Sequence, residues 1–152
     1  MAEKNKVEEI LDFAIEREQK AHDFYMDLAK KMDRPGMKEI FAHFAGEELG
    51  HKAKLQRVKE GKKLLTPTST KVMDLKIGDY LVEVNPNEEL DYQKALILAM
   101  KREKSSYKLY NDIANSTTDA ETKELFLALA QEEAKHKLRF EVEYDEIILA
   151  EN

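Results

Sequence analysis

The feature that most constrains this chain of 152 residues is an internal repeat. When the sequence is shifted by 85 residues, residues 14–52 align with residues 99–137 without a gap, and fourteen of the thirty-nine positions are identical. The identities include two glutamates and one histidine in each copy, namely Glu18, Glu48 and His51, and Glu103, Glu133 and His136. Unrelated helices share hydrophobic periodicity, but they do not share identical polar residues in a fixed register. The repeat therefore predicts two related structural halves.

Each copy of the repeat contains two amphipathic segments. Apolar residues recur at alternating spacings of four and three residues, which is the core pattern of a helical bundle. Capping boxes begin at Asn5, Asn85 and Thr118, and Pro35-Gly36 separates the first two segments. These signals predict helices over about residues 6–32, 36–60, 86–116 and 119–148. Because the link within each pair of helices is short, each pair should form an antiparallel hairpin.

Residues 62–85 join the two predicted hairpins and differ from them in composition. A turn-rich stretch at residues 66–70 precedes scattered apolar side chains that we expect to anchor the link, namely Leu75, Ile77, Tyr80, Leu81, Val82 and Val84. A link of this length can run the full height of a bundle. We therefore predict one all-α domain over residues 1–152, a four-helix bundle of two hairpins (about 6–60 and 86–148) joined by a long crossover.

The composition excludes several classes of protein. At 42% hydrophobic and 37% charged residues the chain is too apolar for disorder, and five Gly and three Pro provide few of the turns that an all-β domain needs. The absence of Cys excludes disulfide frameworks, thiol catalysis and cysteine-bound clusters. The net charge of -6 disfavours nucleic-acid and anionic-membrane partners. Since no apolar run approaches about 18 residues, we expect a soluble, cytoplasmic protein.

The six repeated polar residues lie on the predicted core stripes of the helices. Each glutamate follows an apolar residue of its stripe by one turn, and each histidine follows a glutamate by three residues on the same helical face. No Lys or Arg falls on the four stripes. Burying four carboxylates without cations would cost several kcal/mol for each group, and proton uptake would neutralise only some of them. Two divalent cations would neutralise all four charges and use both imidazoles as ligands.

Simpler interpretations compete with this one. A single Glu-x-x-His turn is more often a solvated pair, but two such turns, each paired with a stripe glutamate one helix earlier, favour a bimetallic site over a coincidence of surface charges. Tyr25 and Tyr110 follow the first glutamate of each copy by seven residues. They are either core side chains or hydrogen-bond donors to metal-bound carboxylates. We expect His22 to flank the stripe without binding metal and His43 to lie at the surface.

The chain resembles rubrerythrin-type members of the ferritin-like superfamily. The resemblance covers both predicted hairpins and rests on the segments EQKAHDFY (Glu18–Tyr25) and EKSSYKLY (Glu103–Tyr110), and on the turns EELGH and EEAKH. Ferritin-like carboxylate bundles use one Glu from each of two helices and a Glu-x-x-His turn from each of the other two. The resemblance implies that Glu18 and Glu103 are terminal carboxylate ligands and that Glu48 and Glu133 bridge the two irons. It also implies that His51 and His136 each bind one iron.

Two departures separate this chain from rubrerythrins proper. It lacks the cysteines of their rubredoxin module, so we expect the electron donor to be a separate protein. The family's extra glutamate, three residues after the ligand of the third helix, is Ser106 here, and its repeat mate is Ala21. The resemblance therefore implies a symmetric six-ligand site for two Fe ions per chain. Mn is the alternative metal, because neutral imidazoles and hard oxygens suit both.

Three functions are consistent with these features. The leading hypothesis is a non-haem diiron-carboxylate oxidoreductase that reduces peroxide or dioxygen with electrons from an external donor such as rubredoxin, with a role in oxidative stress. The alternative is iron handling, by ferroxidation or metal transfer, without a committed peroxide substrate; it would use the same ligands. A third hypothesis is a structural or partner-binding bundle whose metals only stabilise the fold. Because the crossover side chains have no place on the four stripes, we also predict a homodimer, with hairpin exchange through the crossover as one form of it.

Overall fold

The structure is a computed structural model that describes residues 6–31, 34, 36–61, 75–84 and 90–151. Over these residues the chain forms no β-strand, and its helices are α1 (Lys6–Lys31), α2 (Met37–Gly61), the 3₁₀ helix η3 (Ile77–Tyr80), α4 (Tyr92–Ser116) and α5 (Ala120–Glu151). None of these helices combines the length and the apolarity that a membrane span requires.

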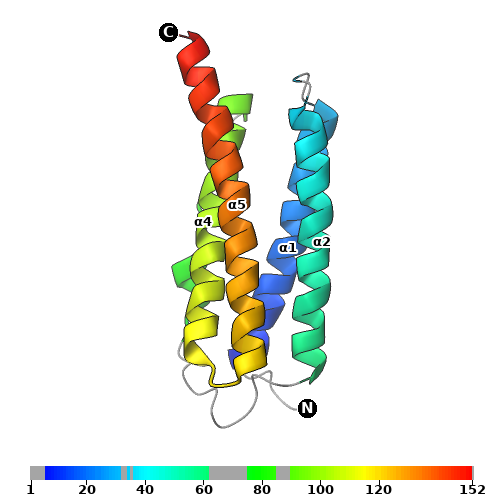
Figure 1. Cartoon of the computed structure of the whole chain (residues 1–152), viewed down its shortest axis with the longest axis vertical. Helices are drawn as coiled ribbons and strands as arrows, with labels where there is room; N and C mark the ends of the chain where they lie inside the picture. The colour runs from blue at the N-terminus through cyan, green and yellow to red at the C-terminus, as the bar shows by residue number, and fades with distance from the viewer. Residues whose placement is uncertain (1–5, 32–33, 35, 62–74, 85–89, 152) are drawn as a thin grey trace. The chain divides into compact units, whose positions relative to one another are not determined.

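The described residues fall into two compact units. One lies within Met1–Leu75 and Ser116–Thr122, and the other within Lys76–Asn115 and Lys123–Asn152. The first unit holds the α1–α2 hairpin, and the second holds η3, nearly all of α4 and most of α5 (Figure 1). That the whole chain is one domain stays a prediction.

Helices α1 and α2 lie side by side as an antiparallel hairpin (Figure 1). Gly36 precedes α2 with a φ of 85°, a left-handed conformation that favours glycine because it has no Cβ. The buried apolar side chains of this hairpin include Val7, Ile10, Leu11, Ala14, Tyr25, Phe41, Ala45 and Leu55. At its rim Lys52 Nζ donates to Gln19 Oε1 at 2.7 Å, and Lys59 Nζ lies 2.5 Å from Asp12 Oδ1. These polar pairs fix the register of the two helices around their apolar faces.

Helices α4 and α5 form the second antiparallel hairpin (Figure 1). The rings of Tyr110 and Phe126 pack with centroids 6.0 Å apart. At the other end of the hairpin, Tyr92 Oη donates to Glu143 Oε1 at 3.0 Å. These contacts join the two ends of α4 to opposite ends of α5, as an antiparallel pair requires.

The start of α4 differs from its predicted position near residue 86. Leu90 and Asp91 are not helical, and the first helical residue is Tyr92. The Asp91 carboxylate accepts a hydrogen bond from the backbone N–H of Lys94 at 2.8 Å, so this aspartate caps the helix. The predicted capping box at Asn85 lies outside the described residues.

The cap of α5 also differs from the prediction by one residue. Asp119, not Thr118, accepts the capping hydrogen bond, from the backbone N–H of Thr122 at 3.0 Å. The hydroxyl of Thr122 donates to the same carboxylate. The aspartate is favoured over the neighbouring threonine as the N-cap, because its negative charge also interacts favourably with the positive end of the helix dipole.

The described part of the crossover is held on α4 by Tyr80. Ser105 Oγ donates to the backbone carbonyl of Tyr80 at 2.6 Å, and Tyr80 Oη donates to Asp112 Oδ2 at 2.7 Å. The ammonium of Lys108 lies 5.4 Å from the centroid of the Tyr80 ring. Burial, followed by the hydrogen bond to Asp112, raises the pKa of the Tyr80 hydroxyl above its usual range.

Two of the predicted crossover anchors are wrong. Tyr80 is buried, but Leu81 is 67% exposed and Val84 is 45% exposed. Leu75, Ile77 and Val82 are half-buried, so Tyr80 is the one predicted anchor of the described crossover residues that is fully buried. Residues 62–74, which include the predicted turn-rich stretch, lie outside the described residues.

Candidate metal centre

The six repeated polar residues are buried, each with about 1% of its surface exposed, namely Glu18, Glu48, His51, Glu103, Glu133 and His136. Their positions follow from the spacing of the core stripes, which turns the same face of each helix inward along its length. No Lys or Arg is buried among the described residues. The protein therefore holds four carboxylates away from water, which is unfavourable unless their charge is compensated.

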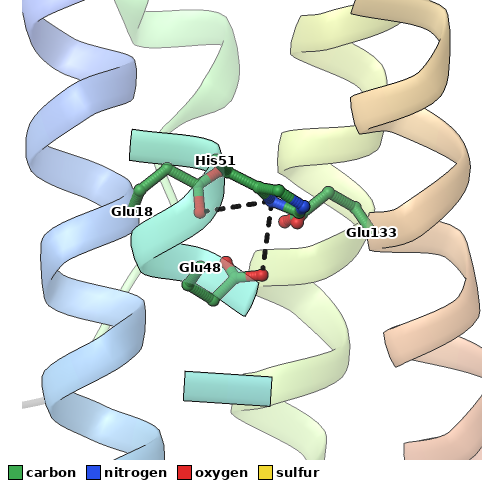
Figure 2. Close-up of side chains that lie close together, drawn as sticks. All are labelled: Glu18, Glu48, His51 and Glu133. Atoms are coloured by element: carbon green, nitrogen blue, oxygen red, sulfur yellow. Dashed lines mark ion pairs between the residues drawn. The ribbon is translucent and has the colours of Figure 1, made fainter. Parts of the chain in front are cut away.

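The first donor set lies in the α1–α2 hairpin. Figure 2 shows His51 with its ring directed at two carboxylates, from α1 and from α2. His51 Nδ1 lies 3.7 Å from Glu18 Oε2 and 3.6 Å from Glu48 Oε1. One ligand atom from each of the three side chains lies within 4.8 Å of the other two. We call Glu18, Glu48 and His51 half-site 1.

The second donor set repeats this arrangement in the α4–α5 hairpin. His136 Nδ1 lies 3.5 Å from Glu103 Oε1. Glu133 precedes His136 by one helical turn, and one ligand atom from each of these three side chains lies within 4.8 Å of the other two. We call Glu103, Glu133 and His136 half-site 2. Each hairpin thus gathers all three side chains that the repeat predicts for it.

The donor atoms of each half-site fit a divalent transition metal. Carboxylate oxygens and imidazole nitrogens are the ligands that Fe and Mn prefer over softer donors. Donor atoms that share one ion at bond lengths of about 2.1 Å lie roughly 3.0–3.4 Å from one another. The distances of 3.5–3.7 Å in the two half-sites are only slightly longer. A small inward movement of the side chains would therefore bring the histidine nitrogen and the carboxylate oxygens within bonding distance of one ion.

Tyr25 and Tyr110 are both buried, two helical turns after the first glutamate of each half-site. Tyr25 stacks on Phe41 with ring centroids 6.3 Å apart, and Tyr110 packs against Phe126 with its ring tilted by 45°. These ring contacts show that both tyrosines pack in the core, which is one of the two roles that the sequence suggests. That their hydroxyls support the ligand carboxylates stays a prediction.

The positions of the family's extra glutamate hold small side chains. Ser106 is buried and follows Glu103 by one turn, on the same face of α4. Ala21, its mate in α1, is half-buried. Neither side chain can take the place of a carboxylate ligand.

The other two histidines have partners outside the half-sites. His22 Nδ1 lies 2.9 Å from the backbone carbonyl of Ala45, which can only accept, so this nitrogen carries the proton. His43 is exposed, and its Nε2 lies 2.8 Å from Glu47 Oε1 one turn later. Sequence reasoning assigned His43 to the surface but missed this i, i+4 partner, which the spacing alone would have indicated.

Sequence reasoning also gave no role to a further buried carboxylate. Glu143 lies on the stripe of α5, two turns beyond His136, and is 2% exposed. It accepts the hydrogen bond of Tyr92 described above. The counterpart of Glu143 in the repeat is Val58, so this polar pair belongs to the second hairpin alone.

Comparisons with known proteins place this geometry in context. The rubrerythrin family model matches residues 9–144. The chain is similar to a protein of Thermotoga maritima, provisionally described as a ferritin-like diiron-carboxylate protein, with a TM-score of 0.73 and 20% identity over 96% of this chain and 99% of that chain. A hypothetical protein of Pyrococcus furiosus gives a TM-score of 0.67 and 26% identity over 91% of this chain and 88% of that chain. A comparison with curated protein sequences gives no match. The predicted ferritin-like four-helix fold is confirmed.

Proposed function

Because this chain belongs to the rubrerythrin family, we propose that it is a non-haem diiron-carboxylate oxidoreductase that reduces peroxide or dioxygen with electrons from an external donor. In this proposal half-site 1 and half-site 2 act together and hold two iron ions per chain, with manganese as the alternative metal.

One observation carries the proposal: the same buried set of two carboxylates and one imidazole occurs in both hairpins. Four carboxylates contribute four negative charges, and neutral imidazoles contribute none. Two divalent ions would cancel this charge, whereas one ion would leave half of it buried and uncompensated. The charge balance therefore supports a two-metal site over a single metal site.

Each ligand would have a defined task. Glu18 and Glu103 would each bind one ion from one side, and His51 and His136 would each donate a ring nitrogen to one ion. The second glutamates, Glu48 and Glu133, would be shared between both. Four anionic oxygens stabilise the higher oxidation state of the metal, so this donor set favours loss of electrons to an oxidant. Two ferrous ions supply, when bound, the two electrons that reduction of peroxide to water consumes.

The residues around the ligands would shape the substrate space. Ser106 and Ala21 are small, and in this proposal they would leave room beside the first glutamates for a molecule of two heavy atoms. The buried rings of Tyr25 and Tyr110, one turn further along the same helices, would help to exclude bulk water. We further assign to the two tyrosine hydroxyls the task of donating hydrogen bonds that orient ligand carboxylates.

The proposed reaction needs an electron donor from outside the chain. Reduction of peroxide to two water molecules consumes two electrons and two protons, after which the metals must be reduced again. The sequence contains no Cys that could bind an iron–sulfur or rubredoxin-type centre. A separate one-electron carrier such as a rubredoxin with its reductase would fill this role.

Stopped-flow mixing of the anaerobically iron-loaded protein tests the proposal. With peroxide we expect one rapid oxidation per site, seen as rising near-ultraviolet absorbance, followed by a stop until the external donor is added. Dioxygen should react more slowly. If no donor sustains turnover while iron is taken up and released in stoichiometric amounts, iron handling becomes the better description. If pyridine nucleotide alone sustains turnover, the need for an external protein donor is wrong.

A further inference from the structure

A groove of about 610 Å³ lies within the second compact unit, between residues 79–83 of the crossover and the α4 stretch 101–112. This volume falls within the range of roughly 300–1,000 Å³ that small-molecule pockets occupy. The six donor side chains of the half-sites do not line the groove. It is therefore a candidate binding site separate from the metal centre.

The crossover wall of the groove is fixed on α4. As described above, the carbonyl of Tyr80 accepts a hydrogen bond from Ser105 and its hydroxyl donates one to Asp112. Further along the wall, Glu83 shares a neighbouring cavity with Lys101. The wall therefore runs antiparallel to α4, from the level of Asp112 toward that of Lys101. Because these hydrogen bonds hold it, the groove is formed before any ligand binds, which favours affinity.

Apolar side chains line the middle of the groove. Tyr107 on α4 is 37% exposed, and Leu81 on the crossover wall is 67% exposed. An aromatic ring on one wall and an aliphatic side chain on the other can hold a planar ring between them. Burying this apolar surface under such a ring would stabilise the complex.

Two lysines, Lys101 and Lys104, follow each other by three residues on α4, so they lie on the same face of the helix. Within the described part of the chain, neither makes an ion pair or a side-chain hydrogen bond, although Asp79 and Glu83 line the same groove. An anion with several oxygens, such as a phosphate, can accept hydrogen bonds from both ammonium groups at once. The α4 wall therefore offers a place for one phosphate.

The other end of the groove carries different polar groups. Asn111 has an amide that both donates and accepts hydrogen bonds, and the Asp79 carboxylate accepts them. Such groups match the N–H and carbonyl edge of a heterocycle. From Lys104 to Asn111 the helix rises about 10 Å at 1.5 Å per residue. Along the groove the order is therefore basic, apolar and then amide.

We propose that this groove binds a mononucleotide, that is, an aromatic heterocycle that carries one phosphate. The phosphate lies against Lys101 and Lys104, and the ring stacks on Tyr107 beneath Leu81. The polar edge of the ring reaches Asn111. Purine and flavin mononucleotides share this chemistry, and the binding measurements distinguish between them.

Glu83 limits the charge of the ligand. It lies on the crossover wall near Lys101, so it opposes an anion at that end of the groove. Together with Lys104, these side chains leave one net positive charge around the phosphate. This balance suits a single phosphate group and disfavours a triphosphate chain.

Isothermal titration calorimetry of the full-length chain tests the proposal, with AMP, flavin mononucleotide, ATP and inorganic phosphate as probes. AMP or flavin mononucleotide should bind at one molecule per chain, and the tighter of the two identifies the ring. Inorganic phosphate and ATP should each bind about tenfold more weakly or less, because the first lacks a ring and the second carries too much charge.

The role of the lysines is tested by exchanging both for glutamine. The variant with Lys101→Gln and Lys104→Gln should bind the mononucleotide about tenfold more weakly or less. The matched control carries Lys38→Gln and Lys123→Gln, which alter two exposed lysines outside the groove and give the same net charge. It should bind as the wild type does.

Two further variants test the ring and the opposing charge. Tyr107→Ala should weaken binding about fivefold or more, as loss of an aromatic stacking partner does, whereas Tyr107→Phe should retain most of the affinity. Glu83→Gln should strengthen binding, because it removes the carboxylate that opposes the phosphate. Circular dichroism of each variant verifies that it remains helical.

Three results would overturn the proposal. The first is that neither mononucleotide binds at millimolar concentration. The second is that inorganic phosphate binds as tightly as the better mononucleotide, since the groove would then hold an anion without contacting a ring. The third is that the two pairs of lysine exchanges weaken binding equally, which would place the site elsewhere. The titrations are run on both the metal-loaded and the metal-free chain, so phosphate binding to the metals is recognised and the outcome is independent of the proposed function.

Discussion

The two hairpins of this protein hold the same donor set in different surroundings. In both, one glutamate of the first helix meets a Glu-x-x-His turn of the second, and a buried tyrosine packs on a phenylalanine. The hairpins differ in the polar contacts that hold their helices together. The α1–α2 hairpin uses exposed or half-buried pairs at its rim, such as Lys59 with Asp12. The α4–α5 hairpin uses a buried carboxylate, Glu143, with the hydroxyl of Tyr92.

This difference shows that the polar contacts between the helices can vary, whereas the donor residues are the same in both hairpins. The helices can be joined by rim ion pairs or by a buried hydrogen bond, because either arrangement satisfies its polar groups. The half-sites show no such freedom, since all three donor residues occur at matched positions in both hairpins. We infer that the two half-sites serve one function together, and the predictions below test whether they are coupled.

The largest effect is expected from removing one histidine. His51→Leu and His136→Leu should each reduce the rate of the fast peroxide phase about 100-fold or more, because even the loss of a residue that supports a metal ligand costs 10–100-fold. His22→Asn is the control and should remain close to the wild type, since its ring contacts a backbone carbonyl instead. Stopped-flow absorbance gives the rates. Two independent sites would lose only about half of the amplitude in each single variant.

The next effect concerns the stability of the metal-free protein. Glu48→Leu and Glu133→Leu each remove a buried negative charge, so each should raise the free energy of unfolding of the metal-free form by about 1–4 kcal/mol while weakening metal binding. Phe41→Ala is the contrasting control and should lower it by about 3–5 kcal/mol, as a cavity does. Urea denaturation with and without metal measures both. If Glu48→Leu destabilised the protein as much as Phe41→Ala does, the charge of the Glu48 carboxylate would already be compensated by other groups of the metal-free protein.

The smallest effect belongs to the crossover segment, which contacts the second hairpin through Tyr80. Tyr80→Phe should lower the free energy of unfolding by about 1.5–3 kcal/mol near neutral pH, because it removes a hydrogen bond to a carboxylate. The raised pKa of Tyr80 means that the unfolded chain loses this proton first, above about pH 10. The advantage of the wild type should therefore shrink as the pH rises above that value.

Tyr107→Phe provides the control for the crossover experiment, because Tyr107 is partly exposed on the same helix. It should change the free energy of unfolding by less than about 0.5 kcal/mol at every pH. A difference between wild type and Tyr80→Phe that grows above pH 10 would contradict the direction of the pKa shift.

The fold class and the family are predicted from the sequence and are confirmed. Two signals made this prediction reliable: core stripes with spacings of four and three, and a repeat that keeps polar residues in register. Helix starts were predicted less well. Asp91 caps α4, six residues after the predicted start, and Asp119 caps α5 in place of Thr118. A polar chain offers several capping residues near each helix start, and tertiary contacts select among them.

The buried position of the six donor side chains was also predicted from the spacing, and the structure gathers three of them in each hairpin. Their roles as metal ligands stay a prediction. The contacts that the sequence could not indicate join residues far apart in the chain. Tyr92 and Glu143 are 51 residues apart, and Tyr80 and Asp112 are 32 residues apart. No local pattern specifies such pairs, since their partners are chosen by how the helices pack.

Anaerobic titration of the metal-free protein with ferrous iron tests the central claim most directly. If the two half-sites form one two-metal centre, binding should saturate at about two ions per chain, and His51→Leu or His136→Leu should weaken the binding of both ions. The diferric form should then show oxo-bridge and carboxylate absorption in the near ultraviolet without thiolate bands. Saturation at one ion per chain, or no binding at all, would contradict the account.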